Sequence, residues 1–349
     1  MSSCRRARQR TTWRCRPGCA PVHVAQSAAP VYPSWVCAGQ LPRLRWDDPA
    51  VQTFLSEGRP VVLTGGCPFS AGIVGRWTLD YLAASDCRLG GNAAHIAPRA
   101  VRRFSRFYGK GLGKGAVLNM SAGEFVQTAV ANEAREAPPW RYYMQSVMVW
   151  SRSSKGGAYN ATAGGRLDTP CGELLHPDFG KDSEGGASPL FEDVRGRLDW
   201  EWLARALDTA QSTGIHSCTV WMGMGGGATP MHFDAMSNFF TQLVGRKRVL
   251  VFPPSQAYNI YPHACEHVQD SYSMVDLEAL GATASSGEAG GGAGAGDVAG
   301  GCGEYPALAR ARGLEATLEA GDVLWLPSFY WHHVRRQGVH ASDPLPHLV

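Results

Sequence analysis

Two segments far apart in the chain carry the residue pattern that most restricts its fold. The first, at 229–254, reads TPMHFDAMSNFFTQLVGRKRVLVFPP, and the second, at 321–334, reads GDVLWLPSFYWHHV. His232 and Asp234 lie two residues apart in a strand-like stretch, so both side chains point from the same face. His332, on the second segment, supplies another imidazole. Two histidines and one carboxylate on one side of a metal leave open positions, an arrangement typical of non-haem Fe(II) sites.

Each of these residues taken alone is more often a hydrogen-bonded core residue than a metal ligand. An H-x-D pair also arises by chance in a chain of 349 residues. The metal site is favoured by the combination of that pair with a following lysine and a distant strand ending in Trp-His-His. His333 faces away from His332 if this segment is a strand, so we predict a structural role for it.

A lysine in the first segment fits the needs of a chelating keto acid. Three protein ligands leave two positions for a 2-oxo acid and one for O₂, and the far carboxylate of a diacid needs a cation. Lys247 follows the turn glycine Gly245 in a predicted hairpin and returns to the interior, while Arg246 and Arg248 face out. The alternative is a solvated turn lysine, because RKR is also a common turn sequence.

Three further polar residues are expected near this site. Thr229, three residues before His232, could donate its hydroxyl to the same carboxylate. Asn238 is four residues from Asp234 and therefore near the metal. Tyr143 could supply a phenolic donor from an earlier strand, with plain packing as the alternative.

The spacing of short strands and turn signals predicts a barrel or jelly roll rather than a parallel sheet. Helices are expected where cap residues precede apolar repeats, near Thr78, Ser121 and Asp199. Strands are expected at 60–64, 142–150, 218–222, 238–244, 249–252 and 322–327.

Composition predicts a single domain at 41–340. Residues 1–40 contain no acidic residue and many arginines, which fits either an organellar transit peptide over 1–35 or a disordered basic extension. Residues 151–189 are rich in Gly, Ser and Lys and predict a long surface loop. Residues 281–303 are almost entirely Gly, Ala and Ser and predict a flexible insert.

Charge and cysteine content limit the partners. The net charge is +3, and much of it lies in the arginine-rich residues 1–40. The rest of the chain is close to neutral, so nucleic-acid binding by it is not expected. The ten cysteines form no C-x-x-C pair, which favours reduced thiols in an intracellular protein of the cytoplasm or nucleus. No apolar run is long enough for a membrane span.

Several segments together resemble the JmjC, or cupin-like, Fe(II)/2-oxoglutarate oxygenases over roughly 41–334. The chain is most similar to the hypoxia-inducible-factor asparaginyl hydroxylase and its close protein-hydroxylase relatives. The segments that carry the resemblance are LPRL at 41–44, DPAVQTFLSEGRPVVLTG at 48–65, W-x-L-D-Y-L at 77–82, YYMQ at 142–145, DWEWL at 199–203, TPMHFD at 229–234, NFFTQLVGRKRVLVFPP at 238–254, YPH at 261–263, VDL at 275–277 and GDVLWLP-x-x-YWHHV at 321–334.

The resemblance implies a mainly β fold, a double-stranded β-helix or jelly-roll core with flanking α-helices. It implies Fe(II) as cofactor, 2-oxoglutarate and O₂ as cosubstrates, and a protein or peptide substrate that is hydroxylated. The family's functional positions fall on His232, Asp234 and His332 for iron, on Lys247, Thr229 and Tyr143 for 2-oxoglutarate, and on Asn238 for an active-site asparagine.

The chain departs from the family pattern in three places, one of which is the glycine-rich insert after Leu280 on the substrate side. Ser271 and Tyr272 stand where the asparaginyl hydroxylase has an Arg-Gln pair that touches its peptide, which weakens the transfer of substrate identity. The last residues, 335–349, read RRQGVHASDPLPHLV. We therefore expect 341–349 to be an atypical tail in which the final barrel strand is missing or replaced. The helices through which that hydroxylase dimerises have no counterpart, so no oligomeric state is predicted.

Three other functions stay open at this point. The same iron chemistry serves N-methyl-lysine demethylases, although the chain shows no reader module or zinc cluster. It also serves hydroxylation of a modified tRNA base, for which the basic arm is slight support. A non-catalytic cupin-like binding protein fits the atypical tail.

Overall fold

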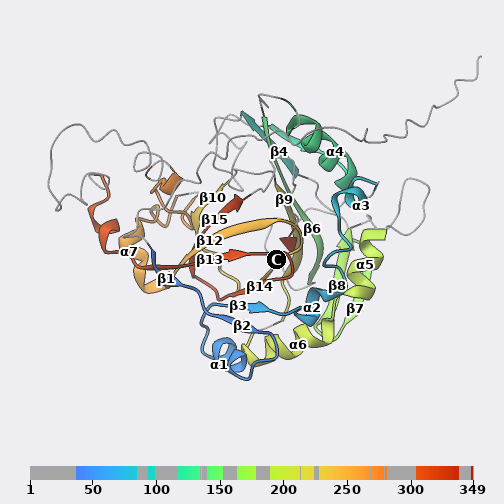
Figure 1. Ribbon diagram of the computed structural model, residues 1–349, viewed down its shortest axis with the longest axis horizontal. Helices are drawn as coiled ribbons and strands as arrows, with labels where there is room; N and C mark the ends of the chain where they lie inside the picture. The colour runs from blue at the N-terminus through green and yellow to red at the C-terminus, as the bar shows by residue number, and fades with distance from the viewer. Residues whose placement is uncertain are drawn as a thin grey trace, which may run out of the picture.

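Eight strands in the second half of the chain, β9 to β16, contribute four strands to each of two facing sheets, one of five strands and one of eleven (Figure 1). In the smaller sheet these strands have the order β13-β12-β15-β10, and in the larger sheet they have the order β14-β11-β16-β9. All neighbouring pairs among these eight strands are antiparallel. The strands are β9 Ser217–Gly223, β10 Ala228–His232, β11 Asn238–Gln242, β12 Arg246–Phe252, β13 Gly313–Leu318, β14 Val323–Leu326, β15 Trp331–Gln337 and β16 His347–Leu348.

The order of these strands identifies the fold. From β9 to β12 and again from β13 to β16, consecutive strands alternate between the two sheets. This winding is the double-stranded β-helix, or jelly roll, so the predicted fold class is confirmed. The computed structural model describes residues 37–84, 93–98, 116–133, 135, 140–151, 163–177, 189–212, 214–223, 228–267, 269–278, 280, 304–337 and 347–348.

Alternation along the strands separates an interior from two outer faces. On β12, Val249 and Val251 belong to the cluster between the sheets, together with Phe240 and Leu324 of the larger sheet. Their neighbours Leu250 and Phe252 belong to a second cluster, on the outer face of the smaller sheet. Because side chains alternate every residue in a strand, Lys247 shares the inward face with Val249 and Val251.

Additional strands extend both sheets. The β1 strand continues the smaller sheet in parallel beside β13. The larger sheet continues through β3 and β2 on one edge and through β6, β4 and β5 on the other, with the β7–β8 hairpin attached to β6. These strands are β1 Cys37–Gln40, β2 Arg43–Arg45, β3 Val61–Thr64, β4 Ala93–Pro98, β5 Ala116–Asn119, β6 Trp140–Ser151, β7 Ala163–Thr169 and β8 Gly172–Pro177.

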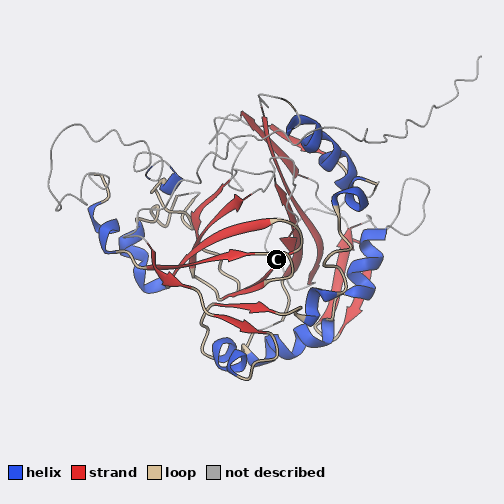
Figure 2. Ribbon diagram, in the orientation of Figure 1, coloured by secondary structure: helices blue, strands red, loops and turns tan. Residues whose placement is uncertain are grey.

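Helices lie around the periphery of the strands (Figure 2). They are α1 Ala50–Ser56, α2 Pro68–Ala71, α3 Leu79–Ala83, α4 Ala122–Glu133, α5 Pro189–Arg197, α6 Trp200–Thr209 and α7 Ala257–Ile260, with short 3₁₀ helices at Pro254–Gln256 and Pro306–Arg310. Helices α1 to α6 pack in the cluster on the larger sheet, and α7 packs in the cluster on the outer face of the smaller sheet.

The expected helix caps are present. Thr78 accepts a hydrogen bond from the backbone N–H of Tyr81, and Asp199 accepts one from that of Trp202. Ser121 and Glu124 exchange the reciprocal side-chain-to-backbone bonds of a capping box. No helix in the described ranges is long and apolar enough to cross a bilayer.

The predicted boundaries need three corrections. Residues 37–40, assigned to the disordered extension, form β1, because their backbone groups pair with the open edge of β13. Part of the predicted 151–189 loop is the β7–β8 hairpin, in which Leu167 and Leu174 bury apolar side chains despite the polar composition around them. Of the two alternatives for the last strand, that it is missing is wrong, and that it is replaced agrees with the structure. Residues 347–348 pair with β11 on one side and with β9 on the other.

The predicted hairpin around Gly245 is a further correction. Gly245 has φ of 70° and does make a turn. However, β11 before it pairs with β14 and β16, whereas β12 after it pairs with β13 and β15, so the turn connects the two sheets. Local sequence specifies such a turn, but strand partners are chosen by distant segments. The predicted transit peptide at 1–35 and the whole of the predicted insert at 281–303 lie outside the described residues.

Candidate metal centre

The neighbouring strands β10 and β15 bring the three predicted ligands together. His232 ends β10 and is the register partner of His332 on β15, and Asp234 follows two residues after His232. The two imidazole ring centroids are 4.1 Å apart, and His332 Nε2 lies 3.8 Å from Asp234 Oδ2. One ligand atom from each residue lies within 4.8 Å of the other two. This spacing fits three donors around a single ion.

Backbone carbonyls orient both imidazoles. The His232 Nδ1 lies 2.8 Å from the Pro230 carbonyl oxygen, and the His332 Nδ1 lies 3.1 Å from that of Tyr330. With Nδ1–H donating to these carbonyls, both Nε2 lone pairs are left for a metal. Burial, reinforced by the neighbouring His232, lowers the pKa of His332 to about 4. His332 is therefore neutral at physiological pH, the state that a ligand needs.

Asp234 is held in place by the segments that flank it. Asn238, at the start of β11, donates from Nδ2 to Asp234 Oδ2 over 2.9 Å. The backbone N–H of Phe329, in the loop before β15, donates to the Asp234 carbonyl over 2.8 Å. Asn238 therefore orients the carboxylate, and the Phe329 bond links the two ligand-bearing loops.

The donor set fits Fe(II). Two neutral imidazoles and one carboxylate are the ligand types of the facial triad, and three protein donors leave coordination positions for small molecules. The residues that would hold the ion are His232, Asp234 and His332.

Tyr272 is a neighbour of this site that sequence reasoning did not assign to it. Its ring stacks on His232 with centroids 5.1 Å apart and planes inclined by 13°. An isolated antiparallel bridge joins the two residues through the backbone. The sequence held a signal, because Tyr272 is one of the two residues that depart from the family pattern before VDL.

The inward-facing lysine lies further along the same interior. Lys247 is fully buried, and its Nζ lies 5.1 Å from the centre of the Phe240 ring. Burial first, and then the nearby Arg336, lower the pKa of Lys247 well below its usual value. The lysine therefore lies inside the fold, where it can meet an anion.

Tyr143 and Thr229 belong to the same end of the interior. Tyr143 is buried on β6, and its hydroxyl is hydrogen-bonded by Thr229 and by Arg336. Burial raises the pKa of Tyr143, and these two bonds oppose that rise. All three residues predicted for the diacid are thus gathered on the inner side, together with Arg336, which was not predicted. The sequence did contain a signal for Arg336. In a strand every second side chain lies on the same face, so His332, Val334 and Arg336 are expected to face inwards together.

The adjacent residues of β15 face outwards. His333 Nε2 lies 3.6 Å from Glu278 Oε1, and Arg335 donates to Glu278 Oε2 over 2.9 Å. All three side chains are buried. This cluster fastens the segment around residue 278 to the outer face of the smaller sheet, as expected for a structural His333.

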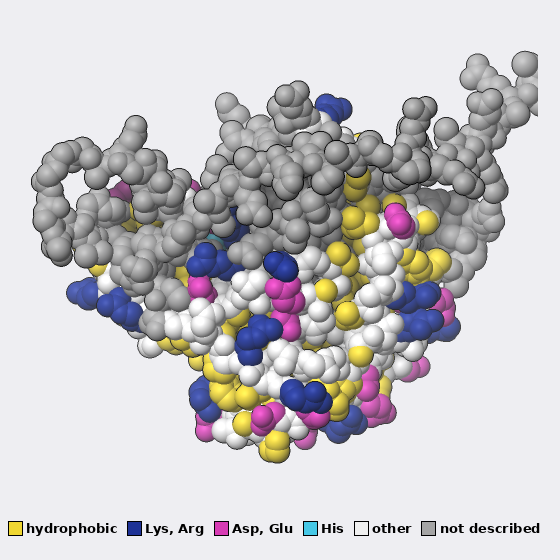
Figure 3. All heavy atoms as spheres, viewed as in Figure 1, with side chains coloured by type: hydrophobic (Ala, Val, Ile, Leu, Met, Phe, Trp, Pro, Cys, Tyr) yellow, Lys and Arg dark blue, Asp and Glu magenta, His cyan; other side chains and the backbone are white. Residues whose placement is uncertain are grey.

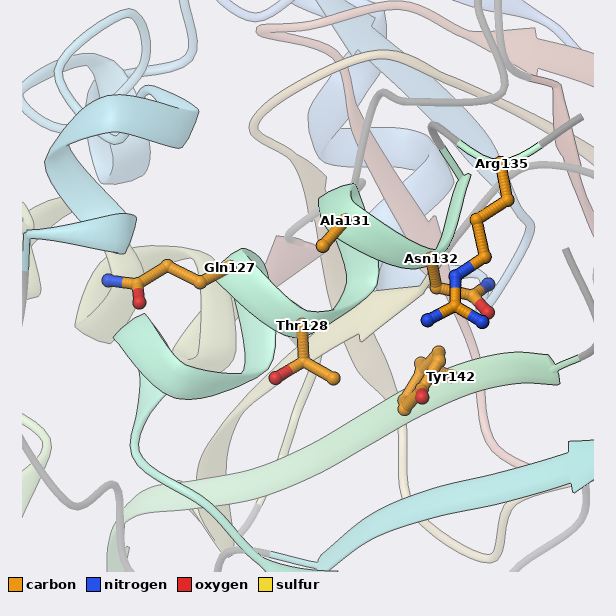
Figure 4. Close-up of a pocket in the computed structure, with 6 residues that line it drawn as sticks. All are labelled: Gln127, Thr128, Ala131, Asn132, Arg135 and Tyr142. Atoms are coloured by element: carbon orange, nitrogen blue, oxygen red, sulfur yellow. The ribbon is translucent and has the colours of Figure 1, made fainter. Parts of the chain in front are cut away.

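Two cavities lined by described residues lie away from this centre. One of 410 Å³ lies between α4 and β6 and includes Asn132, Arg135 and Tyr142 (Figure 4). Tyr142 and Tyr143 are consecutive in β6, so this cavity opens on the strand face opposite Tyr143. Another of 340 Å³ lies between α1 and α6. Neither is lined by a residue of the metal centre.

Comparison with known proteins places the chain in a family. The sequence profile of the cupin-like domain matches residues 48–344, most of the chain. The chain belongs to the cupin-like domain family. Similar proteins include JmjC domain-containing protein D of Dictyostelium discoideum (31% identical over 115 residues), lysine-specific demethylase 8 of Danio rerio (30% over 115 residues) and tRNA wybutosine-synthesizing protein 5 of Mus musculus (29% over 103 residues).

The matches to these cupin-like and JmjC relatives cover only part of each protein. They include 33%, 33% and 30% of this chain, and 21%, 23% and 25% of the three relatives in the same order. One of the three relatives is named a demethylase and another a tRNA-modifying protein, so they do not single out the asparaginyl-hydroxylase branch.

Proposed function

We propose that this cupin-like protein is an Fe(II)- and 2-oxoglutarate-dependent oxygenase that hydroxylates a side chain of a protein or peptide. The observation that carries the proposal is the His232–Asp234–His332 cluster, whose ligand atoms lie within 4.8 Å of one another. A buried lysine, a threonine and a tyrosine on the same inner side supply what the second carboxylate of a keto diacid needs.

The residues have distinct tasks in this proposal. The triad holds the ion, and Asn238 keeps the Asp234 carboxylate turned towards it. Lys247, Thr229 and Tyr143 bind the distal carboxylate of 2-oxoglutarate in a dry environment, where an ion pair is strong. With Fe(II) bound, oxidation of 2-oxoglutarate by O₂ to succinate and CO₂ supplies the oxygen atom that enters a substrate C–H bond.

A polypeptide substrate rather than a nucleic acid is supported by the charges of the described residues on one face of the molecule. On the face shown in Figure 3, Lys and Arg side chains of the described residues are interspersed with Asp and Glu. A phosphate-binding surface would instead gather cations.

Cys67, Cys171, Cys218 and Cys265 are free thiols, which agrees with an intracellular site of action.

Two alternative substrates are supported by the names of relatives. One is an N-methylated lysine, as for the relative named lysine-specific demethylase 8. The other is a tRNA base, as for the relative named tRNA wybutosine-synthesizing protein 5. Both would use the same metal centre on a different C–H bond. A non-catalytic binding protein is the remaining alternative.

Anaerobic spectroscopy tests the assembled centre. Fe(II) and 2-oxoglutarate added to the wild-type protein should give a weak visible charge-transfer band, and His232→Ala should not give it. Folded wild-type protein without the band would favour the non-catalytic alternative.

Mass spectrometry then separates the substrate classes. Candidate polypeptides, methylated peptides and tRNA are incubated with the loaded protein and compared with the His232→Ala variant. A polypeptide that gains one oxygen atom supports the proposal. Loss of a methyl group from lysine would instead identify the protein as a demethylase, and modification of tRNA alone would identify it as a tRNA-modifying enzyme.

A further inference from the structure

Two basic side chains lie side by side in the interior, where a positive charge on one disfavours a positive charge on the other. Lys247 on β12 and Arg336 on β15 are register partners across an antiparallel pair. Directly opposed residues project from the same face with their Cβ atoms about 5 Å apart. Lys247 is 0% exposed and Arg336 is 2% exposed. Burying two positive charges at this spacing costs free energy, which a nearby carboxylate would offset.

Arg336 shares the face that carries the metal ligand. It follows His332 by four residues on β15, and the alternation of a strand returns both side chains to the inner side. Val334 between them belongs to the apolar interior cluster. The metal centre and the cation pair therefore lie along one strand, roughly 13 Å apart at the backbone.

The contacts of Arg336 leave part of its guanidinium unused. Its Cζ lies 4.0 Å from the centre of the Tyr143 ring, and the group hydrogen-bonds the Tyr143 hydroxyl. In the described part of the chain, the Arg336 Nε is buried and has no hydrogen-bond partner. A buried N–H without an acceptor costs about 1–3 kcal/mol, so native proteins rarely keep one without a function.

Gly223 on β9 makes room for the guanidinium. A Cβ at this glycine would lie 2.4 Å from Arg336 Nε and 2.9 Å from Tyr143 Cδ2. Gly223 is also the register partner of Tyr143 on β6. The absence of a side chain at this one position therefore permits Arg336 and Tyr143 to pack together inside the barrel.

The geometry points to Arg336 as a second cation for the keto diacid, which binds the distal carboxylate together with Lys247. This inference rests on the proposed oxygenase function and extends it to cosubstrate selection. A guanidinium presents two N–H groups to a carboxylate, whereas an ammonium acts as a point charge. The pair selects a keto acid with a second carboxylate and discriminates against keto acids that end in an alkyl group.

Equilibrium binding tests this inference without turnover. Mn(II) replaces Fe(II), and titration calorimetry measures the affinities for 2-oxoglutarate and for 2-oxopentanoate, which has the same chain length but lacks the distal carboxylate. Arg336→Met should weaken 2-oxoglutarate binding by about 10- to 100-fold, the range for a charged hydrogen bond. Its affinities for Mn(II) and for 2-oxopentanoate should stay at the wild-type values.

Two further variants complete the design. Gly223→Ala keeps the charge but displaces the guanidinium, so it should weaken 2-oxoglutarate binding in the same direction. Arg246→Met is the matched control, because it also removes one positive charge close to Lys247 in the chain. Arg246 lies on the outer face, where it pairs with Glu319, so this variant should bind 2-oxoglutarate like the wild type.

Unfolding provides a readout that does not depend on metal loading. Without ligand, Arg336→Met should melt at a higher temperature than wild type, because it removes a buried cation whose Nε has no hydrogen-bond acceptor among the described residues. Saturating 2-oxoglutarate should narrow or reverse that difference.

The outcomes separate the two proposals. Wild-type affinity for 2-oxoglutarate in Arg336→Met overturns the role of Arg336 and leaves the oxygenase proposal standing. Wild-type protein that binds Mn(II) but no 2-oxoglutarate overturns both.

Discussion

The ring of Tyr272 lies almost parallel to the ring of His232, with centroids 5.1 Å apart and planes inclined by 13°. Backbone bonds on both sides of Tyr272 hold this arrangement. Phe233 N–H donates to the Ser271 carbonyl, and Ser273 N–H donates to the Met231 carbonyl, each over 2.9 Å. The segment 271–273 therefore runs beside the end of β10 and supports the imidazole that the Pro230 carbonyl orients.

This support predicts a specific effect on metal affinity. Tyr272→Ala removes the stacked ring and should weaken Mn(II) binding by about 10-fold, the lower range for residues that orient a ligand. Tyr272→Phe keeps the ring and should bind Mn(II) like the wild type. Titration calorimetry measures both, and equal affinities for the Ala and Phe variants would contradict the role of the stack.

The adjacent histidines of β15 should behave differently when each is replaced. His332→Ala removes one of three donors and should abolish stoichiometric Mn(II) binding. His333→Ala should bind Mn(II) normally, because this side chain lies on the opposite face beside Glu278.

The His333 variant should instead lose stability. Removing the imidazole takes away a fully buried side chain beside Glu278 and leaves a cavity in its place, so we expect a loss of about 1–3 kcal/mol in the free energy of unfolding. Urea unfolding measures the loss.

The two metal-binding results also test the ligand assignment. Normal Mn(II) binding by His332→Ala, together with lost binding by His333→Ala, would show that His333 is the ligand.

The lowered pKa of Lys247 leads us to expect that the protein takes up protons when the diacid binds. Burial lowers its pKa in the ligand-free protein, so the folded state binds fewer protons than the unfolded state between that value and 10.5. Stability without ligand is therefore lost as the pH falls through this window. A bound carboxylate favours the charged amine and raises its pKa.

The uptake can be measured directly. In this pH window, 2-oxoglutarate binding should take up protons, and the binding heat should differ between buffers with different ionisation enthalpies. Lys247→Met should lower the uptake and weaken binding. A binding heat that is the same in all buffers would mean that Lys247 does not change its protonation.

Phe329 has a backbone conformation that disfavours its side chain. Its φ is 63° and its side chain is half exposed, although left-handed backbone is rare for bulky residues. Phe329→Gly should therefore be more stable than Phe329→Ala by about 0.5–1 kcal/mol, after allowing for the greater freedom of unfolded glycine. Thermal and urea unfolding compare the two variants. A more stable Ala variant would show that this loop carries no backbone strain.

Local sequence determined the parts of this protein that depend on periodicity and short-range hydrogen bonds. Period two placed His232 and Asp234 together and separated His332 from His333. It also turned Lys247 inwards. The caps at Thr78 and Asp199 were predicted for the same reason, since each cap bonds a backbone N–H three residues away.

Only the tertiary structure decided which strands are neighbours. The turn at Gly245 reads as a hairpin, yet its two strands belong to different sheets. Tyr272 reaches His232, and Arg336 reaches Lys247, through pairings between segments far apart in the chain. A strand's own residues set which face each side chain takes. Its partners depend on the free energy of pairing and packing against all the other strands, which no single segment encodes.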